Sequence, residues 1–143
     1  MAERNVNRKL IRAGFLLVLL GLITGLAVQL FQNPRMGLSA HLEGVLNGLL
    51  LVLVGLTWPY FSLPGKRARL LEGLVLYAAF VNWGATSLAA AWGTSRLTPL
   101  AGAGYSGAAW QELVSAVLGI SIVLSAISAL GLAVYSLRSE SAR

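Results

Sequence analysis

Four long apolar stretches, separated by short segments rich in polar residues, glycine or proline, dominate the sequence. They cover residues 10–31, 42–60, 70–92 and 110–137. A helix needs about 20 residues to cross the roughly 30 Å hydrocarbon core of a bilayer, and it satisfies its own backbone hydrogen bonds there. The pattern therefore predicts four transmembrane helices in a single domain that covers residues 1–143.

The segments between the stretches contain residues that favour turns. We interpret Asn33-Pro34 as the end of the first helix, because proline disfavours helical geometry in the residue before it. Residues 93–107 contain a proline and several glycines, and we expect them to form a loop. Inside the first stretch, Gly21 and Gly25 have the spacing that lets two membrane helices approach closely, which predicts helix packing.

The composition agrees with a membrane protein. Hydrophobic residues make up 57% of the chain and charged residues 11%, whereas a soluble domain has about a quarter of its residues charged. The fold class is therefore predicted to be all-α, an integral membrane four-helix bundle. The chain has no cysteine, which excludes disulfides, thiolate metal sites and a cysteine nucleophile. No phosphate-binding loop, dinucleotide fingerprint or nucleic-acid motif is present.

The net charge of +6 is distributed unevenly among the segments that connect the stretches. Nine basic residues lie in the two terminal segments and the middle loop: Arg4, Arg8, Lys9, Arg12, Lys66, Arg67, Arg69, Arg138 and Arg143. The other two connections have one each, Arg35 and Arg96. Because short cytoplasmic loops carry an excess of lysine and arginine, the N and C termini and the middle loop are predicted to be cytoplasmic.

A few polar residues lie inside or beside the apolar stretches, where they are costly and point to function. They are His41, Glu43 and Asn47 at the start of the second stretch, Glu72, Asn82 and Thr86 in the third, and Gln111 and Glu112 in the fourth. With the predicted topology, all except Glu72 fall in the outer half of the bundle, where they can line a ligand pocket. Glu72 lies near the middle loop, and we expect it to pair with Arg69 or another exposed charge.

His41 is the only histidine, so the chain cannot form a zinc site with several histidines. His41 can act as a proton relay, or it can hold a haem iron through one axial bond. His41 and Asn47 are about 120° apart around a helix, so both can border one cofactor-sized cavity. Simpler roles stay open: interfacial polar residue for His41, interhelical hydrogen bonds for Asn47 and Asn82, and interfacial carboxylates for Glu43 and Glu112.

Three segments resemble the hydroxylaminobenzene mutases, small bacterial membrane enzymes related to the styrene oxide isomerases. The most specific segment is residues 33–48, with the sequence NPRMGLSAHLEGVLNG. The others are residues 80–83, FVNW, and residues 110–112, WQE. The resemblance spans nearly the whole chain and includes the four-helix plan. It implies an integral protein of the bacterial inner membrane.

The resemblance also implies a homotrimer that binds haem b at its subunit interfaces. His41 would be the axial ligand of the haem iron. Asn47 and Asn82 would orient the substrate, and Glu43 or Glu112 would orient the histidine or move protons.

One departure from the related epoxide isomerases separates the two branches. Thr86 stands where those enzymes have an active-site tyrosine, which favours the mutase branch. Tyr105, in the predicted loop, is a candidate source of a phenol group.

The implied reaction rearranges a hydroxylaminoarene, such as hydroxylaminobenzene, to an ortho-aminophenol, with ferric haem as a Lewis acid. One alternative in the same fold is an epoxide isomerase of the styrene oxide type, which converts an aryl epoxide to an aldehyde. An alternative of another class is a non-enzymatic small transporter or assembly subunit, although the chain lacks the internal repeats and broken helices common in transporters.

Overall fold

The computed structural model describes residues 5–137, which form four long helices and contain no strand. The helices are α1 (Arg8–Leu26), α2 (Pro34–Leu56), α3 (Gly65–Trp92) and α4 (Ala109–Leu137). Short 3-10 turns, η1 (Val28–Leu30) and η2 (Trp58–Tyr60), follow α1 and α2. Each long helix is apolar enough and long enough to cross a membrane. The predicted all-α fold with four membrane-spanning helices is thus confirmed.

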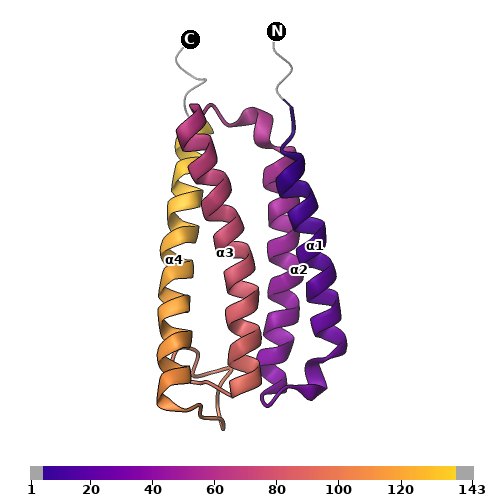
Figure 1. Ribbon diagram of the computed structural model, residues 1–143, viewed down its shortest axis with the longest axis vertical. Coiled ribbons are helices and arrows are strands. Elements are labelled where there is room, and N and C mark those ends of the chain that lie inside the picture. Colours follow the sequence, from indigo (N-terminus) through magenta and orange to yellow (C-terminus); the bar gives the residue numbers. More distant parts are fainter. Residues whose placement is uncertain (1–4, 138–143) are drawn as a thin grey trace.

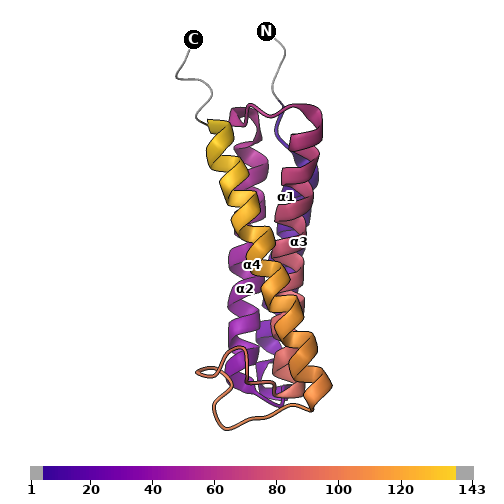
Figure 2. The same ribbon diagram turned by 90° about the vertical axis from the view of Figure 1, so that its left-hand side faces the viewer.

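The four helices form two neighbouring antiparallel pairs, as Figure 1 shows. α1 packs along α2, while α3 packs against both α2 and α4. Figure 2 shows that α4 crosses the bundle obliquely. The start of α1, the α2–α3 connection and the end of α4 lie at one end, which we call the basic end. The α3–α4 connection lies at the opposite end, which we call the loop end.

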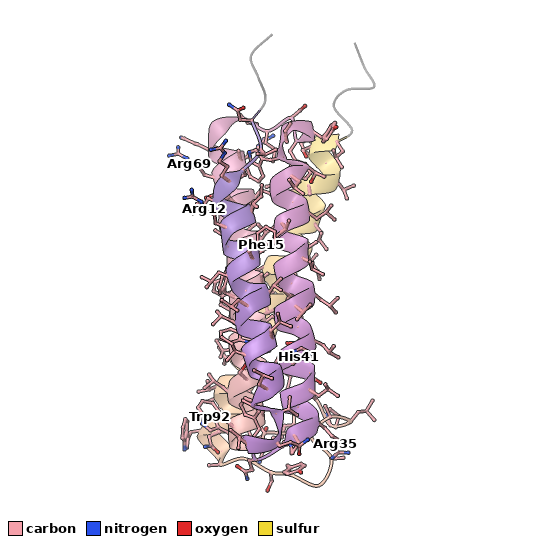
Figure 3. All side chains as sticks on the ribbon, turned by 90° about the vertical axis from the view of Figure 1, so that its right-hand side faces the viewer. Arg12, Phe15, Arg35, His41, Arg69 and Trp92 are labelled. Atoms are coloured by element: carbon pink, nitrogen blue, oxygen red, sulfur yellow. The ribbon has the colours of Figure 1, made fainter. Side chains whose placement is uncertain are left out.

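The charges of the described residues follow this division. Six basic residues belong to the basic end: Arg8, Lys9, Arg12, Lys66, Arg67 and Arg69. Arg35 and Arg96 belong to the loop end, and Figure 3 shows Arg35 far from Arg12 and Arg69. Arg4, Arg138 and Arg143, which the topology prediction also used, lie outside the described residues. The cytoplasmic location of the basic end stays a prediction.

The helix boundary predicted at Asn33-Pro34 is wrong, because these residues begin α2 and do not end α1. The Asn33 side chain accepts hydrogen bonds from the backbone N–H groups of Arg35 and Met36, at 3.1 and 3.2 Å, and so caps the helix. Proline fits the first helical position, where its missing N–H has no partner to lose. Since α2 starts at Pro34 and not near residue 42, His41 lies inside the helix and not at its start.

Glycines let the backbones of α1 and α2 approach closely. A Cβ at Gly44 would come within 2.6 Å of the Gly21 Cα, and a Cβ at Gly48 would come within 2.7 Å of the Gly14 carbonyl oxygen. Side chains at these positions would push the helices apart, so small residues are required here. We call this contact the glycine seam. Gly21, which the sequence marked for packing, lies in it.

The outward faces of the helices are apolar, most clearly on α4. The apolar side chains of α4 that are more than half exposed include Leu113, Val117, Ile120, Leu124, Ile127 and Leu130. A water-soluble monomer rarely exposes such a continuous apolar surface. Lipid or another protein chain can cover it without an unfavourable transfer from water, as a membrane fold requires.

Candidate active site

Two small cavities lie between α2, α3 and α4. The loop-end cavity has a volume of about 120 Å³, and its walls include Met36, Glu43, Asn82, Thr86, Thr94, Leu97 and Ile122. The mid-bundle cavity has a volume of about 100 Å³, and its walls include Asn47, Val54, Ala79, Asn82, Ile122 and Ala126. Because Asn82 and Ile122 line both cavities, the two spaces are neighbours. Four of the polar residues singled out in the sequence therefore meet in one region.

Glu43 and Thr86 connect α2 to α3 in the wall of the loop-end cavity. The Thr86 hydroxyl donates a hydrogen bond of 2.6 Å to Glu43 Oε2. This bond fixes the orientation of the carboxyl group and leaves Oε1 to accept or return a proton. A carboxyl group held in this way beside a cavity has the chemistry of a general acid or base.

The Nδ2 atom of the Asn47 side chain is buried and has no hydrogen-bond partner among the described residues. A buried donor without a partner costs about 1–3 kcal/mol, so an unpaired group of this kind calls for an explanation. Asn47 lines the mid-bundle cavity, and Asn82 lines both cavities. An amide offers both donors and an acceptor, so the pair can orient a small polar ligand.

His41 lies on a different face of α2 from the cavities. Its Nδ1 atom is 2.8 Å from the carbonyl oxygen of Gly21 in α1. Its ring packs on Gly25, where a Cβ would come within 2.6 Å of Nδ1. Because a carbonyl oxygen only accepts, Nδ1 carries the proton and Nε2 carries the lone pair. Figure 3, viewed from the α1–α2 side, shows His41 on this side of the bundle.

Within one chain, the structure does not bring His41 and Asn47 to a common cavity, although their spacing in the sequence allows this. The turn of about 120° between them around α2 directs His41 toward α1 and Asn47 toward α3 and α4. The two residues thus belong to two separate surfaces of the same helix.

Glu112 holds the loop that closes the loop end of the bundle. The residue is only 4% exposed. Its carboxylate accepts hydrogen bonds of 3.0–3.3 Å from the backbone N–H groups of Ser95, Arg96 and Gly107. Hydrogen bonds to an ionised acceptor are strong, so they fix the loop. Glu112 lines neither cavity, so it is placed to position the loop and not to exchange protons with a ligand.

Two further residues from the sequence analysis also lie away from the cavities. Gln111 accepts a hydrogen bond of 2.7 Å from the backbone N–H of Ala108 and so stabilises the start of α4. The Tyr105 ring lies under the guanidinium of Arg35, 6.0 Å from its central carbon. Tyr105 therefore attaches the loop to α2, and it lines neither cavity.

Glu72 lies at the basic end, as expected. It accepts hydrogen bonds from Lys9 Nζ at 2.5 Å and from Asn7 Nδ2 at 2.8 Å, which tie α3 to the start of α1. The expectation of pairing with an exposed charge is confirmed, and the partner is Lys9 rather than Arg69.

Several residues of the cavity wall were not predicted from the sequence. Thr94 and Leu97 come from the loop, and Ser115 and Gly119 come from α4. The hydroxyl oxygens of Thr94 and Ser115 lie 3.1 Å apart and join the loop to α4. The four-residue spacing of Ser115 and Gly119 marks a small-residue face of α4, which was a usable signal. Loop residues have no periodic pattern, so the contribution of Leu97 to the cavity wall could not be predicted from the sequence.

This arrangement combines apolar walls with three kinds of polar group: a carboxyl, a hydroxyl and two amides. It can hold an aryl ring, orient a polar substituent and move a proton. The described residues contain no cluster of three histidine, aspartate or glutamate side chains that could hold a bare metal ion. A metal that needs only one protein ligand, such as a haem iron, fits the donor set better.

Comparisons with known proteins connect the chain to a family. A family model described as styrene oxide isomerase matches residues 6–138, which include all four helices. Over 137 residues, 95% of this chain and 84% of the relative, the chain is 44% identical to hydroxylaminobenzene mutase HabB of Ectopseudomonas oleovorans. Over 115 residues, 80% of this chain and 85% of the relative, it is 40% identical to hydroxylaminobenzene mutase HabA of the same organism. No solved structure matches the chain.

Proposed function

This chain belongs to the styrene oxide isomerase family and is an isomerase with a membrane-spanning fold, and we propose that it rearranges a hydroxylaminoarene, such as hydroxylaminobenzene, to an ortho-aminophenol. The observation that carries the proposal is the unpaired Nδ2 atom of Asn47, buried beside the mid-bundle cavity, which adjoins the loop-end cavity and its Glu43 carboxyl group. The names of the two mutase relatives support this reaction. Family membership speaks against the transporter or assembly-subunit alternative.

Epoxide isomerisation is the second candidate, because the matching family is described by that activity. The same cavities would then take an aryl epoxide and release an aldehyde. Thr86 supports the mutase reaction, because it stands where the related epoxide isomerases have a tyrosine and so provides no phenol to the cavity wall. Its hydroxyl group is instead bonded to Glu43.

The proposed reaction needs no external oxidant or reductant, because substrate and product are isomers. The N–O bond breaks, a C–O bond forms at the ortho carbon, the ring loses a proton at that carbon, and the nitrogen gains one. We assign the orientation of the hydroxylamino group to the amides of Asn47 and Asn82. Glu43, held by Thr86, would accept and return the proton. The apolar walls would exclude water from the charged intermediate.

The surroundings of His41 would suit a residue that holds a haem iron. Its Nδ1 proton is held by the Gly21 carbonyl, which orients the ring and leaves the Nε2 lone pair for a metal. The Gly25 surface that receives the ring would be filled by any Cβ. Ferric haem b bound through His41 would supply a Lewis-acidic iron for a substrate heteroatom. His41 itself would act as a ligand and not as a proton donor.

We further propose that the complete site forms between copies of the chain. His41 faces the α1–α2 side, whereas Glu43, Asn47 and Asn82 line cavities between α2, α3 and α4. One chain therefore offers the axial ligand on one surface and the substrate groups on another. A homo-oligomer, a trimer by the family resemblance, would place His41 of one copy against the cavities of the next. The exposed apolar side chains of α4 offer surface for such contact.

The basic end is assigned to the cytoplasmic side of a bacterial inner membrane, because six basic residues of the described part of the chain belong to it. The absence of cysteine from the whole sequence makes a direct test simple. Single cysteines at Gly65 and Ser106, which lie at the two ends, would be treated with an impermeant maleimide in intact cells. Labelling at position 106 and not at 65 is expected, and the reverse pattern contradicts the orientation.

The main test joins a visible absorption spectrum to product analysis for purified protein expressed with ample haem. The wild type should show a haem Soret band and convert hydroxylaminobenzene to 2-aminophenol, with styrene oxide as the competing substrate. His41→Ala should lose the band and the activity together. Ser39→Ala is the matched control, since this nearby hydroxyl donates its hydrogen bond within α2, to the Arg35 carbonyl at 3.3 Å. A His41→Ala variant that retains haem would refute the ligand assignment.

A further inference from the structure

A wider groove adjoins the loop-end cavity on the outer side of the bundle. It has a volume of about 400 Å³, and we call it the outer groove; its walls include Asn82, Leu97, Thr98, Gly119, Ile120 and Val123. Five residues line both the loop-end cavity and the outer groove: Asn82, Leu97, Thr98, Gly119 and Ile122. The two spaces are therefore parts of one depression, divided where these residues meet.

The Leu97 side chain lies at this boundary. It extends from the loop onto α4 above Gly119, and a Cβ at Gly119 would overlap the Leu97 Cδ2 atom. Leu97 can therefore pack here only because Gly119 has no side chain. The neighbouring Ser95 and Arg96 N–H groups are bonded to the buried Glu112 carboxylate, so the backbone before Leu97 is fixed. Leu97 itself is 46% exposed and can rotate or be shortened without removing a core residue.

The volumes indicate what this division does. An apolar cavity of about 150 Å³ in another protein holds one benzene molecule. The loop-end cavity, at about 120 Å³, is somewhat smaller than that and therefore has room for no more than a single ring. A substituent that projects from the ring toward α4 would meet Leu97 before it reached the outer groove.

We infer that Leu97 is the specificity-determining residue of this site and that the outer groove is a subsite for apolar substituents on the arene. This inference rests on the proposed function, since it names which hydroxylaminoarenes the site accepts. Leu97 selects small, unsubstituted rings by closing the groove. A shorter residue opens the groove to longer alkyl groups.

The experiment compares kcat/KM for hydroxylaminobenzene and for its 4-butyl derivative. Leu97→Ala should raise the ratio of substituted to unsubstituted substrate by about tenfold or more, because a methylene group in an apolar pocket changes discrimination by that order. Leu97→Phe should lower the same ratio. Leu100→Ala is the matched control, because Leu100 lies in the same loop, is 92% exposed and lines neither space. A ratio that Leu97→Ala shifts no more than Leu100→Ala does would overturn the assignment.

A binding measurement separates this inference from the proposed reaction. Aniline and 4-butylaniline lack the reactive N–O bond, and their binding to wild type and variants in lipid nanodiscs requires no turnover. Leu97→Ala should gain affinity for 4-butylaniline relative to aniline, and Leu100→Ala should not. If the wild type does not convert hydroxylaminobenzene, the proposed function fails, and the aniline result still decides the role of Leu97.

Discussion

The separation of His41 from the substrate cavities allows a sharp test by mixing two inactive variants. His41→Ala removes the proposed axial ligand on the α1–α2 side, and Asn47→Ala removes an amide in the mid-bundle cavity. Each variant alone is expected to be inactive. Co-expression should restore activity if one copy supplies His41 and its neighbour supplies Asn47. A site complete within one chain would stay inactive in every mixed assembly.

The recovered activity follows from the arrangement. In a closed ring, each site needs an intact histidine from one copy and an intact asparagine from the next. With random mixing of equal amounts, about a quarter of the sites satisfy both conditions. If two different affinity tags are used in succession to isolate only mixed assemblies, about a third of the sites in a trimer are active, against about half in a dimer. The recovered fraction thus also reports the size of the oligomer.

The assay measures turnover of hydroxylaminobenzene per chain, alongside haem content from the Soret absorbance. The matched control pair is Asn47→Ala with Asn82→Ala, because both amides line the mid-bundle cavity of the same chain. That pair should recover no activity, since no copy has an intact cavity. Recovery near zero for the pair His41→Ala and Asn47→Ala, in assemblies shown to be mixed, would refute the shared site.

Three further variants test the packing and the site. Gly44→Ala should destabilise the fold by about 1–3 kcal/mol in thermal unfolding. Gly73→Ala is the control and should not destabilise it, because a Cβ there would have no neighbouring atom within 4 Å. Equal stability of the two variants would contradict the glycine seam. Glu112→Gln should loosen the loop by about 1–3 kcal/mol and expose it to protease, and unchanged cleavage would argue against its positioning role. Thr86→Val should lower kcat/KM about tenfold by releasing Glu43, and full activity would remove this pair from the mechanism.

The sequence predicts the fold well because lipid imposes a simple rule on it. A spanning segment must be helical and apolar, so the four helices could be located from hydropathy alone. The boundary at Asn33-Pro34 failed for a physical reason: proline both ends a helix and begins one, and the polar residues Arg35 and Ser39 hid the first turns of α2.

The candidate site is harder to predict, because in lipid the outward face of a helix is as apolar as the inward one. The residues around α2 therefore do not reveal which of its faces meets α1 and which meets α3. The depth of His41, Asn47 and Asn82 could be predicted, but the direction of each side chain could not. The role of Glu112 could not be predicted for a similar reason. A carboxylate near the start of a helix suggests an interfacial position, and only the structure shows the loop that it binds.

The glycine seam implies an order of events during synthesis in the membrane. The chain emerges with its N-terminal half first. Because α1 and α2 meet backbone to backbone at Gly21 and Gly44, this hairpin can close before α3 and α4 exist. The hydrogen bond that orients His41 lies within the same hairpin. Both cavities, in contrast, require α2, α3 and α4 together. The residue proposed to hold the cofactor can therefore be in place before a newly made chain has a cavity in which to bind a substrate.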